Sequence, residues 1–131
     1  MKYFYAVMHQ EGDSAFGVTF PDLPGCNSAA DDIKDVLPNA CEALELWFDD
    51  QLEIEPSRLD QVRDMAVDDL ANGGTLIAVP RIVNDHRVTR VNLSMERGML
   101  DAIDTAARER SLTRSAFITQ AARNEIEGVR R

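Results

Sequence analysis

Residues 87–94 are the segment that most limits how this chain can fold. They alternate apolar and polar side chains as a half-buried β-strand does, with Val91 and Leu93 on the apolar face. Helical patterns follow this strand instead of a second strand. A lone strand leaves its backbone groups unpaired and its apolar face open to water. The simplest completion is a second copy whose strand pairs antiparallel about a two-fold axis, so the sequence predicts a homodimer or a higher even oligomer.

Two amphipathic helical patterns come after the predicted strand. The first is interrupted at Ser111, and the second begins after Thr113, a residue type that favours helix N-caps, and ends near Gly128. We expect the strand and both helices to form a β-α-α module over residues 85–131, with one core shared by two copies. The side chains predicted to form this dimer core are Val91, Leu93, Leu100, Ile103, Phe117 and Ile118.

The polar face of the predicted strand indicates DNA reading. In a paired ribbon, Arg90, Asn92 and Ser94 would be displayed twice. A two-stranded ribbon fits the major groove, where arginine pairs with guanine and asparagine with adenine. Ser94 is also placed to cap the first helix, which would compete with base reading. The start of the second helix offers backbone N–H groups that suit a phosphate, and these belong to Thr113, Arg114 and Ser115. The alternative is that the strand and helices are an ordinary piece of one α+β core.

Charge divides the chain near the same place. Residues 1–84 hold sixteen Asp and Glu against five Lys and Arg, a balance of −11, and residues 85–131 hold seven against nine, a balance of +2. DNA repels an acidic domain, whereas a basic partner protein is attracted to it. The acidity could also serve solubility alone. We place the boundary at the short polar stretch Asn84-Asp85-His86, which predicts domains 1–84 and 85–131.

The N-terminal domain shows strand patterns at both ends and helical patterns between them. Strands are expected over residues 2–9, 15–20, 26–29 and 75–82. Pro80 within the last of these strands indicates an edge position or a bulge. This arrangement predicts a mixed α+β fold.

A long helix is expected after the third strand, capped by Asp31 or Asp32. Pro38 either kinks this helix or marks the start of its regular part. A second helical pattern opens at Pro56-Ser57 and stops at Asn72-Gly73-Gly74. Acidic side chains fall largely away from the apolar stripe of the long helix, and we interpret them as candidate contacts to a basic partner: Glu42, Glu45, Asp49 and Glu53.

Three C-terminal segments resemble the ribbon-helix-helix repressors of the Arc and MetJ type. They are Arg-Val-Asn-Leu-Ser-Met-Glu, Met-Leu-Asp-Ala-Ile-Asp and Ser-Leu-Thr-Arg-Ser-Ala-Phe-Ile, in this order. The resemblance implies that Arg90, Asn92 and Ser94 contact bases and that the segment beginning at Thr113 contacts phosphate. Ser111 stands where a glycine often ends the first helix of that family.

The N-terminal half resembles the HicB antitoxins, most specifically in Pro21-Asp22-Leu23-Pro24-Gly25-Cys26. This resemblance implies a partial ribonuclease-H-like fold that binds and blocks a HicA-type toxin, a small RNA-cleaving protein. Together, the two resemblances imply an antitoxin that neutralises its toxin and, as a dimer on operator DNA, represses its own operon. The alternative is a ligand-sensing ribbon-helix-helix repressor that has no toxin partner.

Several classes of protein are not expected. The chain has no apolar run long enough for a membrane span and no secretory pattern at its start, which favours a cytoplasmic protein with Cys26 and Cys41 reduced. The two histidines are far apart in sequence, so neither a metal nor another cofactor is expected. Asp13, Asp22, Asp31 and Asp32 are candidates for carboxylate-metal chemistry, but aspartates in loops and helix caps are usually conformational. We therefore expect no enzymatic activity.

Overall fold

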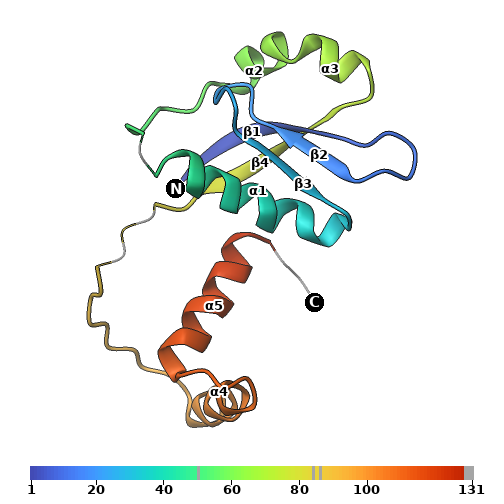
Figure 1. The fold of residues 1–131 in the computed structure, drawn as a ribbon. Coiled ribbons are helices and arrows are strands. Elements are labelled where there is room, and N and C mark those ends of the chain that lie inside the picture. The colour runs from blue at the N-terminus through green and yellow to red at the C-terminus, as the bar shows by residue number, and fades with distance from the viewer. Residues whose placement is uncertain (50, 84, 86, 129–131) are drawn as a thin grey trace. The chain divides into compact units, whose positions relative to one another are not determined.

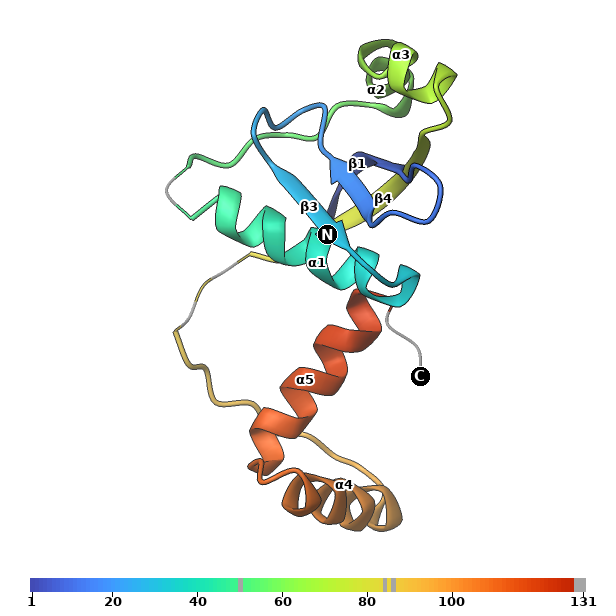
Figure 2. The same cartoon turned by 45° about the vertical axis from the view of Figure 1, so that its right-hand side comes forward.

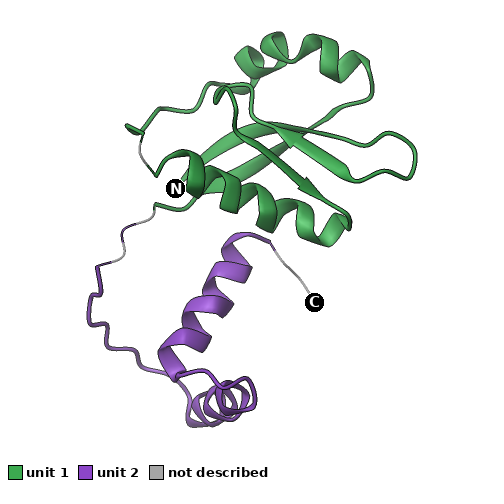
Figure 3. Cartoon of the chain, viewed as in Figure 1, with its two compact units in different colours: residues 1–84 green, residues 85–131 purple. Residues whose placement is uncertain are grey.

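The computed structural model describes residues 1–49, 51–83, 85 and 87–128. The chain divides into two compact units, residues 1–84 and 85–131 (Figure 3). Asn84 and His86, two of the three residues of the expected boundary stretch, lie outside the described residues. No helix in the described part of the chain is long and apolar enough to cross a membrane.

The first unit contains a four-stranded antiparallel sheet with the strand order β3-β2-β1-β4 (Figure 1). The expected strands are all present, and the expected mixed α+β class is confirmed. Strand β4 lies at an edge of the sheet, which is one of the two positions that Pro80 indicated. The strands are β1 (Lys2–His9), β2 (Phe16–Thr19), β3 (Asn27–Ala30) and β4 (Thr75–Arg81).

Alternation along the strands gives the sheet one fully buried face. Phe4 pairs with Val79 in neighbouring strands, and both side chains are fully buried in one core cluster with residues of helix α1 (Ile33–Trp47). This helix covers that face of the sheet (Figures 1 and 2). Val36, Ala40, Cys41 and Leu44 are its buried residues, at the spacing of one helical face.

Helix α1 begins where one of the two expected caps lies. The Asp32 side chain accepts a hydrogen bond from the backbone N–H of Lys34 at 3.0 Å. The helix already contains residues 33–37 when it reaches Pro38, so a regular helix starting only at Pro38 is wrong. The helix ends at Trp47, and the next residue, Phe48, is buried in the core, where its ring centroid lies 5.5 Å from that of Phe4.

The second helical pattern of this unit folds as two short helices, α2 (Leu59–Met65) and α3 (Val67–Ala71). The backbone of Ala66 leaves the helical region, with φ −104° and ψ 17°, and its side chain is buried with that of Val62. The side chain of Met65, next to Ala66, is exposed. Gly73 adopts φ +98° after α3, a conformation that favours glycine, and this explains the expected stop.

The second unit consists of helices α4 (Arg97–Glu109) and α5 (Arg114–Ile126), preceded by an irregular segment. Between the helices, Ser111 takes the left-handed φ of 56°, at the position where related sequences were expected to have glycine. Thr113 caps α5 as expected, because its side chain accepts a hydrogen bond from the backbone N–H of Ala116 at 3.1 Å.

The strand expected over residues 87–94 is absent from the single chain. Residues 87–96 form neither helix nor strand. A strand requires a neighbour that accepts and donates its backbone hydrogen bonds, and one copy of the chain contains no second ribbon segment. The expected intermolecular pairing therefore stays a prediction.

Candidate functional site

Both faces of the segment 87–94 are accessible in the single chain. The predicted base readers Arg90, Asn92 and Ser94 are exposed. Ser94 does not cap α4, because the N-cap residue of that helix is Glu96. The alternative role of Ser94 is thus not used, and all three polar side chains are available to a ligand.

The apolar face of the same segment is as open as the polar face. Val91 is 69% exposed and Leu93 64%. The other predicted dimer-core residues, on α4 and α5, are only partly buried: Leu100, Ile103, Phe117 and Ile118. Among the described apolar side chains of this unit, Ala107 alone is buried. One copy therefore leaves the apolar faces of its segment and helices without a closed core.

A groove of about 1250 Å³ lies between this segment and α5. Its apolar lining comes from both sides, and Arg87, Arg90 and Arg123 contribute cations. The apolar lining residues are Val88, Val91, Leu93, Ala116 and Ile118.

The predicted phosphate contacts lie at the start of α5. Thr113, Arg114 and Ser115 are exposed. Arg114 is bound to Asp104 of α4 through two hydrogen bonds, from Nε to Oδ1 at 2.8 Å and from Nη2 to Oδ2 at 2.9 Å. The bonds from Arg114 lower the pKa of the Asp104 carboxyl, and the same bonds raise the pKa of Arg114. This pair is therefore ionised at neutral pH.

The four acidic residues predicted to contact a partner do not share one helix. Glu42 and Glu45 lie on α1, whereas Asp49 and Glu53 come after its end at Trp47. Their expected place on the long helix is wrong, because the chain turns at Phe48. Glu42 and Asp49 are exposed, and Glu45 is half-buried.

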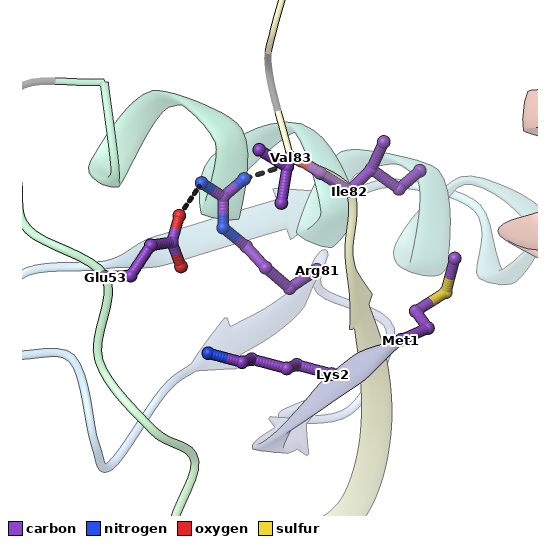
Figure 4. Close-up of a pocket in the computed structure, with 6 residues that line it drawn as sticks. All are labelled: Met1, Lys2, Glu53, Arg81, Ile82 and Val83. Carbon is purple, nitrogen blue, oxygen red and sulfur yellow. Dashed lines mark hydrogen bonds and ion pairs between the residues drawn. The ribbon is translucent and has the colours of Figure 1, made fainter.

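Glu53 belongs to an ionic cluster that sequence reasoning missed (Figure 4). Arg81, whose side chain is 4% exposed, donates from Nη2 to Glu53 at 2.7 Å and from Nη1 to the carbonyl of Ile82. Its guanidinium lies 4.3 Å from the centre of the Phe48 ring. Lys2, the register partner of Arg81, binds Glu55 at 2.6 Å. A charged residue at the end of an otherwise apolar strand was the only sequence signal.

The ionic cluster is structural. It borders a cavity of about 460 Å³ lined by Met1, Lys2, Glu53, Arg81, Ile82 and Val83. The Lys2 and Arg81 side chains each have a carboxylate partner, so these two charges are compensated within the protein. The two ion pairs fasten Glu53 and Glu55 to the ends of β4 and β1.

The residues considered for chemistry have conformational roles or stay apart. Asp22 accepts a hydrogen bond from the backbone N–H of Ser57 at 2.8 Å, and Asp32 caps α1. Among the described residues, no group of His, Cys, Asp and Glu is arranged to hold a metal ion. Cys26 and Cys41 are buried, and neither is in a disulfide. Burial raises the pKa of Cys26 to about 11, so this thiol is protonated and unreactive at neutral pH.

The sequence matches the model of the HicB-like antitoxins of bacterial toxin-antitoxin systems over residues 4–122. The chain belongs to this family. The family expected from the Pro-Asp-Leu-Pro-Gly-Cys stretch is thus confirmed, and an antitoxin role in a toxin-antitoxin system follows from membership. The match spans most of both units of this HicB-like antitoxin.

Solved structures of HicB antitoxins resemble this HicB-like antitoxin. The crystal structure of the Burkholderia pseudomallei antitoxin HicB is 28% identical, covers 93% of this chain and 96% of its own, and superposes with a TM-score of 0.53. Antitoxin HicB3 is 24% identical, with coverages of 95% and 97% and a TM-score of 0.50. The N-terminal domain of the B. pseudomallei protein is 23% identical over 62% of this chain and 99% of its own, with a TM-score of 0.50. No curated protein gives a significant sequence match.

Proposed function

We propose that this HicB-like antitoxin neutralises a HicA-type RNA-cleaving toxin through residues 1–84. We further propose that, as a dimer built on residues 85–131, it binds operator DNA and represses its own operon. The observation that carries the second part is the open apolar surface of the second unit, centred on Val91 and Leu93. The family match supports the first part and favours it over a ligand-sensing repressor.

The dimer follows from the exposed apolar face. Fully burying one Val or Leu side chain stabilises an assembly by about 1.5–3 kcal/mol. Pairing residues 88–94 with the same segment of a second copy would bury Val91 and Leu93 from both chains and supply the missing backbone partners. The half-buried residues of α4 and α5 would then complete a ribbon-helix-helix core.

DNA binding follows from what this pairing would leave outside. Because side chains alternate along a strand, burial of Val91 and Leu93 turns Arg90, Asn92 and Ser94 outward from both copies. Arginine and asparagine make bidentate contacts to guanine and adenine in the major groove. The start of α5, with Thr113, Arg114 and Ser115, would meet the backbone phosphates.

Toxin binding follows from the charge of the first unit. An RNA-cleaving toxin must present a basic surface to the phosphate backbone, and residues 1–84 carry a balance of −11. Covering the toxin's RNA-binding surface would inhibit it without any enzymatic step by the antitoxin. The proposed contacts are Glu42, Glu45, Asp49 and the 44% of the Glu53 side chain that stays exposed beside Arg81.

The proposal is tested with full-length variants in cells that carry the toxin gene and a promoter reporter. Arg90→Ala or Asn92→Ala should lower operator affinity by about 1–3 kcal/mol and relieve repression, while rescue from the toxin persists. The paired change Glu42→Lys with Glu45→Lys should abolish rescue, while repression persists. Normal repression by Asn92→Ala would contradict the ribbon assignment, and normal rescue by the paired change would contradict the acidic contact surface.

A further inference from the structure

The ion pair between Asp104 and Arg114 joins the two helices of the second unit. Asp104 lies on α4 and Arg114 is the first residue of α5, ten positions later. Both carboxylate oxygens of Asp104 accept hydrogen bonds from Arg114, Oδ1 from Nε at 2.8 Å and Oδ2 from Nη2 at 2.9 Å. The Asp104 side chain is partly covered, and more than half of the Arg114 side chain is exposed. The guanidinium is thus tethered on one side and open to solvent on the other.

Because the guanidinium is planar, an ion pair on one of its edges also fixes the direction in which the opposite edge points. The guanidinium carries five N–H donors in one plane, and these form two edges that can each bind an anion with two hydrogen bonds. Asp104 occupies the edge made by Nε and Nη2. Within the described part of the chain, Nη1 has no hydrogen-bond partner, so the edge made by Nη1 and the second Nη2 hydrogen is available. An untethered arginine loses side-chain rotamer entropy when it is ordered on binding, whereas a tethered one has already lost much of it.

We propose that Asp104 is a positioning residue for DNA binding: it holds Arg114 by one edge so that the opposite edge meets a backbone phosphate. The inference rests on the proposed DNA-binding function. According to this proposal, the acidic residue Asp104 raises the affinity of the second unit for DNA, although DNA is itself negatively charged. Electrostatics alone predicts the reverse, because a carboxylate near DNA is repelled by phosphate. The sign of the effect of removing Asp104 therefore separates the two explanations.

Asp101 is a matched control on the same helix. It is exposed, and its carboxylate has no partner among the residues that the structure describes. Asp101→Asn and Asp104→Asn remove the same charge three residues apart, but only the second change releases Arg114. Arg114→Lys is a complementary variant, since lysine keeps the positive charge but has no second edge to present.

The experiment measures fluorescence anisotropy of the full-length protein with two labelled duplexes over a series of salt concentrations. One duplex spans the promoter upstream of the gene for this chain, and the other is a scrambled sequence of equal length. Asp104→Asn should weaken binding to both duplexes about 3- to 10-fold, because a phosphate contact is independent of sequence, and should flatten the salt dependence. Asp101→Asn should bind as tightly as the unmodified protein or more tightly.

Two further outcomes would support the proposal. Arg114→Lys should lose about as much affinity as Asp104→Asn, and in an Arg114→Ala background Asp104→Asn should no longer weaken binding. Light scattering on each variant checks that it has the same oligomeric state as the unmodified protein, so that differences in affinity do not come from loss of the dimer. If Asp104→Asn tightens binding as Asp101→Asn does, or if it weakens binding equally without Arg114, the positioning role is wrong. If the unmodified protein binds neither duplex, the proposed DNA-binding function itself fails.

Discussion

The two units of this HicB-like antitoxin bury their apolar side chains to very different extents. In the first unit, Phe4, Leu23, Leu44 and Val79 are fully buried between the sheet and α1. In the second unit, the apolar side chains of the segment before α4 are mostly exposed. The first unit therefore has a closed core in one copy, whereas the described apolar side chains of the second unit do not form one. A closed core suits the first unit, whose proposed partner is a different protein. An open apolar surface suits the second unit, because its proposed target, an operator, is read by two copies.

Leu93→Asp tests this contrast with the largest expected effect. A charge at the proposed two-fold interface would be buried without a partner, so the dimer should be lost. Light scattering should then report a monomer, while the first unit stays folded by the fluorescence of Trp47, the single tryptophan of the chain. Leu52→Asp, at an exposed position of the first unit, should leave the dimer intact. A dimeric Leu93→Asp protein would place the interface elsewhere.

Glu53→Gln tests the first unit, and we expect an intermediate loss in its free energy of unfolding. Removing a carboxylate from a buried pair costs about 3–5 kcal/mol, but Glu53 is 44% exposed, so solvent screening reduces the expected loss to about 1–2 kcal/mol. Urea unfolding followed through Trp47 measures this loss. Glu55→Gln breaks the exposed pair with Lys2 and should cost about 0.5 kcal/mol or less. Equal effects of the two variants would show that Arg81 does not depend on Glu53.

Ser111→Gly sharpens the comparison with the smallest effect, a gain of stability in the second unit. Ser111 has φ 56°, and a left-handed conformation costs a residue with a Cβ roughly 1 kcal/mol more than glycine. The variant should raise the midpoint of the transition that far-ultraviolet circular dichroism assigns to α4 and α5, by an amount equivalent to about 0.5–1 kcal/mol. The midpoint of the Trp47 transition should not move. A lower stability would mean that the serine hydroxyl has a compensating contact.

Features that depend on neighbours in sequence were predicted well. The caps of α1 and α5 at Asp32 and Thr113 follow from short side-chain contacts within one turn. The strands follow from alternation, and the edge position of β4 agrees with the missing N–H of Pro80. The family was recognisable because its most specific stretch, residues 21–26, is contiguous.

Features that depend on distant residues were not predicted. The length of α1 was overestimated: the helix ends at Trp47, whereas the acidic residues assigned to it continue to Glu53. The Arg81 cluster joins β4 to Glu53, a pairing that no local pattern indicates. The predicted base readers and dimer core could be placed on a segment and two helices, but their strand requires a second chain. The contacts to DNA and toxin stay predictions for the same reason.

The burial of both cysteines has a practical consequence for thiol chemistry. Cys26 and Cys41 are the chain's only cysteines, and a maleimide reagent needs an accessible thiolate. A cysteine introduced at Val88, which is 98% exposed and lies on the face that the proposed ribbon turns outward, would therefore be labelled in preference to the native pair. Cross-linking such cysteines between two copies with reagents of increasing length would measure how far apart the two segments lie. The shortest reagent that gives a covalent dimer on a denaturing gel would then indicate the register in which the two strands of the proposed ribbon pair.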